Sequence, residues 1–303
     1  MNTHINQQMS ARDIGALIIL SVLWGGSFFF VEILVNYLPM LTIVTARVGL
    51  AAILLWGIIR IRRVPLPKTI LHWTALCGVG FLNNALPFCL IVWGQTQINS
   101  GLASILNATA PFFTVMIAGA FLADERLSGR KLLGVVTGIA GTAVLIGPEA
   151  LQGMTGSTLG QLAVAGAALC YAIAGVFSRR FKGWGISPLM VATGQATTAA
   201  LMLLPLALFF DQPWTLTMPP NHAIAALMGL ACLSTVVAYI LYFRLIASAG
   251  ATNAALVTFL IPISAILLGV FILGEAFSLQ QAAGALIIGL GLIIMDGRLL
   301  SRR

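Results

Sequence analysis

The chain has 303 residues, of which 59% are hydrophobic and 8% are charged. An average soluble domain carries about 25% charged residues, and the mean hydropathy of this chain is +1.02. The composition excludes a soluble globular enzyme, a disordered chain and a disulfide scaffold, and it leaves a membrane protein with several spans. The net charge is +8. Because basic residues collect on the cytoplasmic side of membrane proteins, we ascribe this excess to topology and predict no nucleic-acid partner.

Ten apolar segments are long enough, or nearly so, to cross a lipid bilayer. A spanning helix needs roughly 20 apolar residues to cover ~30 Å of hydrocarbon. The fifth and tenth segments are the shortest, and prolines stand in several of the gaps, as is usual at helix boundaries. The predicted spans are 14–35, 40–60, 71–93, 98–122, 130–147, 158–179, 188–210, 222–243, 251–273 and 279–296.

The basic residues predict the orientation of these spans. Of the 16 Lys and Arg residues, 15 lie before the first span, after the tenth span, or in the gaps after the even-numbered spans and the span ends that border those gaps. The gaps on the opposite side hold none. By the positive-inside rule, both termini are expected in the cytoplasm. The predicted fold class is therefore an all-α membrane protein with ten transmembrane helices in a lipid bilayer.

The second half of the sequence repeats the first. Residues 121–147 align with 272–297 at an offset of 150 residues. We expect one five-helix repeat over 13–148 and a second over 157–298. Because five is odd, the second repeat enters the membrane from the opposite face, an inverted arrangement typical of secondary transporters. The matched pairs are Glu125 with Glu275, Ser128 with Ser278, Gly134 with Gly284, Gly141 with Gly291, and Gly147 with Gly297.

No segment is available to carry enzyme chemistry. The gaps between spans are short, and the sequence has neither a GxxxxGKS/T motif for ATP nor an HExxH metal motif. No acid–base pair or Ser–His set falls at membrane depth. We therefore predict no enzymatic activity, no cofactor and no metal site, and we expect any transport to run on gradients.

Four features occur together in this chain: the ten-span layout, the repeated stretches, VLWGGSFFF in the first span and ARVGL in the second. In these features the chain resembles the drug/metabolite transporter superfamily, EamA type. The resemblance covers essentially the whole chain. It implies two EamA repeats in a bacterial inner-membrane exporter of amino acids or other small metabolites, with aromatic amino acids among the candidates. The alternative is a multidrug or cationic-compound exporter of the same fold.

Two ionisable residues, Glu32 and Arg47, fall within the predicted hydrocarbon region. A charge there costs at least about 2.5–3.5 kcal/mol on insertion scales, so each needs a partner or water. At about 1.5 Å of rise per residue their depths differ by roughly 6 Å, which a structural salt bridge could span. The other interpretation is that Arg47 attracts a substrate carboxylate or that Glu32 titrates during transport. The residue that matches Arg47 in the second repeat is Ala196, so any such role belongs to one half.

Buried amides form a first group of candidate substrate contacts. An unpaired amide in lipid costs several kcal/mol, so Asn83, Asn84 and Asn107 must face protein or a wet cavity. Pro87 removes an intrahelical hydrogen bond and frees a carbonyl near Asn83. Thr258 matches Asn107 in the second repeat. Interhelical hydrogen bonding explains these residues about as well as a cavity does.

Deep aromatic residues form a second group. Trp24, Tyr171 and Tyr239 lie near mid-depth and could stack on a substrate, although an aromatic ring in a helical bundle belongs to the core more often than to a site. Trp93 and Tyr242 are interpreted as anchors at the membrane interface. Glycines 134, 138, 141, 284, 289 and 291 predict close packing in the fifth and tenth spans. The predicted substrate-binding residues, between the repeats, are Trp24, Ser27, Asn83, Asn84, Pro87, Asn107, Tyr171, Tyr239 and Thr258.

Overall fold

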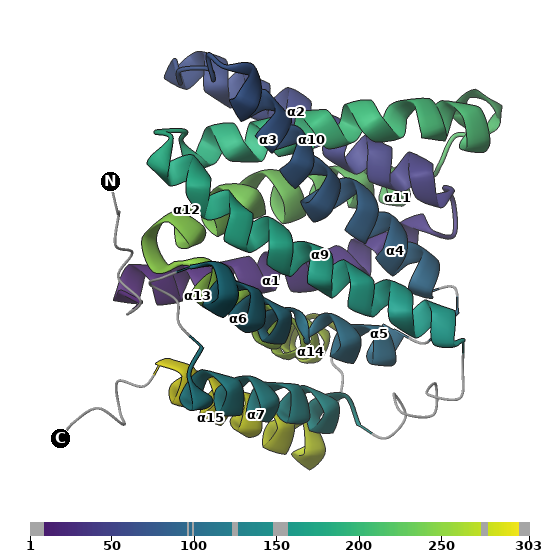
Figure 1. Cartoon of the computed structure of the whole chain (residues 1–303). Helices are drawn as coiled ribbons and strands as arrows, with labels where there is room; N and C mark the ends of the chain where they lie inside the picture. The colour runs from purple at the N-terminus through teal and green to yellow at the C-terminus, as the bar shows by residue number, and fades with distance from the viewer. Residues whose placement is uncertain are drawn as a thin grey trace.

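The computed structural model describes residues 9–95, 97–98, 100–122, 127–147, 157–273 and 278–296. Within these ranges every regular element is a helix, as the composition predicts. Figure 1 shows the helices gathered into one bundle, with α7 and α15 side by side along one edge.

The first half contains two long unbroken helices followed by interrupted ones. Its third and fourth spans are each built from helices placed end to end, and in the third span a π-helix joins them. The elements are α1 (Ala11–Leu34), α2 (Met40–Arg62), α3 (Ile70–Gly80), the π-helix η1 (Phe81–Ala85), α4 (Leu86–Gln95), α5 (Ser100–Asn107), α6 (Ala110–Phe121) and α7 (Gly129–Ile146).

The second half has interruptions at corresponding places. A π-helix again divides its third span, and its fourth span is again broken near the middle. The elements are α9 (Thr158–Gly183), α10 (Pro188–Leu206), η3 (Ala207–Asp211), η4 (Pro213–Thr215), α11 (Asn221–Ala231), the π-helix η5 (Cys232–Val237), α12 (Ala238–Ala249), α13 (Ala251–Ala255), α14 (Val257–Leu273) and α15 (Leu279–Asp296).

Each of the ten predicted spans coincides with a helix or with helices placed end to end. In the described part of the chain, seven helices are long and apolar enough to cross a membrane, and three further apolar helices are shorter. The molecule is therefore an integral membrane protein with several spans, while the count of ten stays a prediction. The shorter helices are Ile105–Phe121, Ala251–Ser264 and Leu279–Met295.

The interruptions follow from local sequence in some spans and not in others. Pro87 has no backbone N–H to give to the carbonyl four residues earlier, and just before it the hydrogen bonding widens, so that Leu86 N–H donates to the Phe81 carbonyl. Pro111 stands in the first turn of α6, where the lack of an N–H costs nothing. The π-helix η5 contains no proline, so the sequence offers no comparable signal that would predict it.

Close backbone contact joins α7 to α15. A Cβ atom placed on Gly284 would lie 2.4 Å from the Cα of Leu145, and one on Gly141 would lie 2.6 Å from the backbone nitrogen of Ile288. Only glycine permits this approach, which confirms the packing predicted for these positions. Gly289 is the exception, because a Cβ there would meet nothing within 4 Å. The prediction of close packing at that residue is therefore wrong.

The remaining helices pack around the centre of the bundle. Helix α1 contacts α11, α12 and α14 of the second half, α10 packs on α2 and α3, and α9 packs on α4 and α6. Leu20 of α1, Phe181 of α9 and Tyr239 of α12 belong to the largest buried apolar cluster. The two halves therefore interlock.

Candidate functional site

A cavity lies at the centre of the bundle, with an empty volume of about 1050 Å³ that includes space at its open side. Both halves of the chain supply its walls. Helix α2 forms part of the wall, whereas the described residues of α7, α10 and α15 do not line the cavity. The lining residues are Trp24, Ser27, Val31, Ile43, Val44, Arg47, Asn83, Phe88, Ile91, Val92, Asn107, Ala110, Thr114, Tyr171, Leu230, Tyr239, Tyr242, Ala255, Val257, Thr258 and Ile261.

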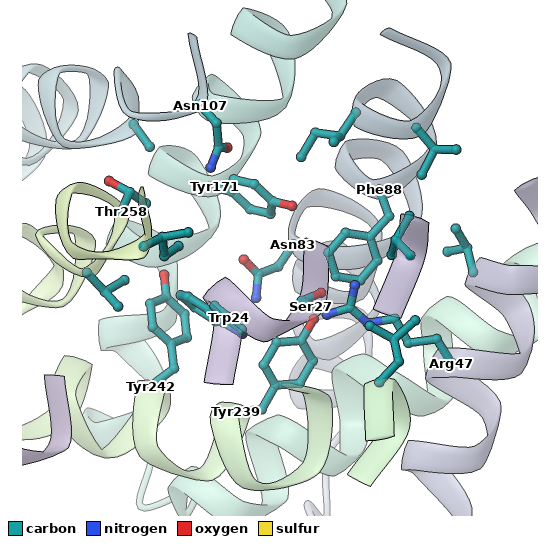
Figure 2. A pocket seen from close by; sticks show the side chains of 18 of the residues that line it. Trp24, Ser27, Arg47, Asn83, Phe88, Asn107, Tyr171, Tyr239, Tyr242 and Thr258 are labelled. Atoms are coloured by element: carbon teal, nitrogen blue, oxygen red, sulfur yellow. The ribbon is translucent and has the colours of Figure 1, made fainter. Parts of the chain in front are cut away.

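Aromatic rings form much of the wall. Figure 2 shows Trp24, Tyr171, Tyr239 and Tyr242 around the same space. The ring centroids of Trp24 and Tyr242 are 5.3 Å apart at an angle of 52°. Tyr242 is only 7% exposed, so its interpretation as an interfacial anchor is wrong. The position of Tyr242 along the sequence indicates its depth but not the direction in which its ring points. The packing of α12 turns the ring toward the cavity.

Asn84 and Pro87 do not line the cavity. Asn84 is fully buried, and its Oδ1 accepts a hydrogen bond from the Tyr239 hydroxyl. This bond fixes the direction of the Tyr239 ring at the cavity wall. The structure therefore places Asn84 behind the cavity wall, and Pro87 is not among the lining residues.

Asn83 faces the cavity and is held from behind by a second amide. Its Nδ2 donates to Oε1 of Gln195 at 2.9 Å, and Gln195 is fully buried in α10. Gln195 was not predicted from the sequence, although an amide in an apolar span is a signal that could have identified it. Asn83 uses one of its two Nδ2 hydrogens in this pair, and its Oδ1, an acceptor, receives no hydrogen bond from the described residues.

Asn107 and Thr258 stand at the interruptions of α5–α6 and α13–α14. Figure 2 shows both side chains at the cavity. The Thr258 hydroxyl donates to the Ala255 carbonyl at 2.9 Å. The Oδ1 atom of Asn107 is buried and has no hydrogen-bond partner among the described residues. An acceptor of this kind can receive a hydrogen bond from a polar ligand.

Arg47 projects from α2 into the wall and is 7% exposed. Its Nε donates to Thr235 Oγ1 at 2.9 Å, and its Nη2 donates to the Ser234 carbonyl at 3.3 Å. Its Cζ lies 4.1 Å from the centroid of the Phe88 ring. A guanidinium stacked on an aromatic face gains a cation–π attraction. Sequence reasoning identified Arg47 but missed all three of these partners.

The predicted pair of Glu32 and Arg47 remains a prediction. The backbone of Glu32 belongs to α1, but its side chain lies outside the described part of the structure. Among the described side chains, Arg47 forms hydrogen bonds and a ring contact but no ion pair.

An all-helical membrane fold enclosing a polar and aromatic cavity between two halves is the architecture of a membrane transport protein. The chain matches the model of the EamA-like transporter family over residues 13–147 and 158–295. It belongs to this family and is a membrane transporter, which confirms the resemblance seen in the sequence.

Named relatives match over nearly the full chain. A probable amino-acid metabolite efflux pump of Escherichia coli (strain K12) is 28% identical, with 94% of this chain and 95% of that protein covered. The uncharacterized transporter YoaV of Bacillus subtilis (strain 168) is 26% identical, with 95% and 97% covered. A crystal structure shares the fold with a TM-score of 0.79 at 20% identity, covering 97% of this chain and 100% of that one.

Proposed function

We propose that this protein exports amino acids or closely related amphiphilic metabolites across the bacterial inner membrane. The observation that carries the proposal is the composition of the cavity. It places a guanidinium, amides and tyrosine hydroxyls on walls that are otherwise apolar and aromatic. An amino acid has the matching chemistry, with a charged head group and a variable side chain. The names of the Escherichia coli and Salmonella typhimurium relatives, probable amino-acid metabolite efflux pumps, support this cargo.

The transport cycle we propose is alternating access by two inverted repeats, 13–148 and 157–298, with ten spans and both termini in the cytoplasm. The placement of interruptions supports this symmetry. The π-helices η1 and η5 divide the third span of each repeat, and breaks beside Asn107 and Thr258 divide the fourth. Exchange of the two repeat conformations would open the cavity to the other face of the membrane. The cargo shifts this equilibrium only by its difference in affinity for the two states.

The cavity residues named in the sequence analysis are the proposed cargo contacts. Asn84 and Pro87 have a different proposed role, in which they hold the wall that the cargo touches. The proposed contacts are Trp24, Ser27, Asn83, Asn107, Tyr171, Tyr239 and Thr258.

A second candidate function is export of organic cations, which the aromatic wall favours because ring faces attract cations. The buried charge of Arg47 in the same wall opposes it, since like charges repel most strongly away from water. Amino-acid export is therefore the better supported of the two.

Flux measurements with the purified protein in liposomes test the proposal. We expect liposomes that contain the protein to exchange a radiolabelled amino acid faster than empty liposomes. Repeating the assay with and without a proton gradient shows whether transport is coupled to protons. Transport of a cationic dye with no exchange of any of the 20 amino acids would favour the second candidate and reject the first.

Labelling tests the proposed topology. In a cysteine-free background, Lys68→Cys and Gln152→Cys place single thiols in the gaps after the second and fifth predicted spans. A membrane-impermeant maleimide added to intact cells should label position 152 and leave position 68 unlabelled. Labelling of both positions from outside would reject the inverted arrangement.

A further inference from the structure

The guanidinium of Arg47 is held along one edge and is open at its end. An arginine carries five N–H donors and no acceptor. Nε and one hydrogen of Nη2 lie on a shared edge and are used on Thr235 and Ser234. The other three donors, two of them on Nη1, have no hydrogen-bond partner among the described residues, and Arg47 lines the cavity. The free end is the fork that binds a carboxylate through two parallel hydrogen bonds.

The charge of Arg47 is not neutralised by any carboxylate that the structure describes. Two acidic side chains are described, and both are engaged elsewhere. Asp13 bonds to Ser10 and Ser248, and Asp211 bonds to Thr42. A buried cation that lacks an anion is costly inside a membrane. An anionic ligand at the free end of the guanidinium would supply the missing charge.

The cavity that Arg47 lines also contains hydrogen-bond acceptors. The Tyr239 hydroxyl gives its proton to Asn84, so its oxygen remains an acceptor. Asn83 gives one of its two Nδ2 hydrogens to Gln195, and its Oδ1, an acceptor, receives no hydrogen bond from the described residues. Ser27, Asn83 and Tyr239 line the same cavity as Arg47 (Figure 2). Acceptors in the same cavity as a cationic fork match a head group that carries an ammonium next to a carboxylate.

We infer that Arg47 binds the cargo carboxylate, and that the transported class is therefore amino acids with a free carboxylate. The inference rests on the proposed function and narrows it. Thr235 and Ser234 act as positioning residues, because they hold the guanidinium and are not among the residues that line the cavity. Phe88 stacks on the guanidinium and also lines the cavity. Amino-acid amides and decarboxylated amines lack the anion, so the cavity binds them weakly.

Binding to the purified full-length protein in detergent tests this inference. The ligands are leucine and phenylalanine, each compared with its amide and with the corresponding amine. We expect the wild-type protein to bind each amino acid at least about 10-fold more tightly than its amide, as hydrogen bonds to charged groups imply. In Arg47→Gln, affinity for the amino acid falls about 10- to 100-fold while affinity for the amide is unchanged. The matched control is Arg60→Gln, an exposed arginine on the same helix, which binds like the wild type.

If Arg47→Gln does not fold, a second variant that keeps Arg47 but removes one of its hydrogen-bond partners tests the same inference. Thr235→Val removes the acceptor of Nε and should weaken binding of the amino acid more than binding of its amide. Equal wild-type affinities for acid and amide, or equal losses for both in the variants, would overturn the carboxylate assignment while leaving amino-acid transport intact. Recovery of folding in an Arg47→Gln, Glu32→Gln double variant would show a structural ion pair and also overturn it. No binding or flux of any amino acid by the wild type would reject the proposed function instead.

Discussion

Because α7 and α15 pack closely at Gly284, we expect a substitution at this residue to lower the stability of the protein. A Cβ atom there would lie 2.4 Å from the N, Cα and Cβ atoms of Leu145. Ordinary van der Waals contact begins near 3.4 Å, so Gly284→Ala requires the helices to separate by about 1 Å. These are mostly backbone atoms, which cannot rotate away as a side-chain end can. Overpacking of this kind costs about 1–3 kcal/mol, and we expect a clear fall in the melting temperature.

The matched control lies on the same helix. Gly289→Ala adds the same methyl group where nothing stands within 4 Å, so it should leave stability unchanged or raise it slightly through the better helix propensity of alanine. Thermal unfolding of both variants in one detergent compares them directly. Cargo binding per folded molecule should stay at the wild-type level, because α15 does not line the cavity. A Gly284→Ala protein as stable as Gly289→Ala would refute the close packing of these helices.

Three further changes separate other contacts. Asp211→Ala removes the carboxylate that accepts a hydrogen bond from the backbone N–H of Thr42 at 2.6 Å. This bond caps the first turn of α2, where Pro39 offers no side-chain cap. Thermal unfolding should show a loss of stability of about 0.5–2 kcal/mol, and an unchanged melting temperature would contradict this capping. Tyr239→Phe leaves the buried Asn84 Oδ1 without its donor and should cost about 1–3 kcal/mol, measured in the same way, with no loss arguing against the bond. Trp24→Ala should weaken cargo binding in a radioligand assay while Trp24→Phe retains most of it, and equal affinity in both would remove this ring from the proposed site.

The sequence alone predicted the helical membrane class, the family and the positions of the apolar helices. These features depend on composition and spacing along the chain. A run of about 20 apolar residues must become a helix in lipid whatever its neighbours are, because its backbone polar groups have no other partners. The glycines of the fifth and tenth spans likewise predicted close packing, which the structure confirms at Gly141 and Gly284.

The tertiary structure alone decided which side chains meet. Successive residues on a helix point about 100° apart, so Asn83 reaches the cavity while Asn84 bonds to Tyr239 behind it. Depth in the membrane could not distinguish these two neighbours. Nor could it show that Tyr242 turns inward, or that the partner of Arg47 is Thr235, 188 residues away along the chain. Such contacts depend on the rotation and crossing of packed helices, which many distant side chains determine together and no local pattern records.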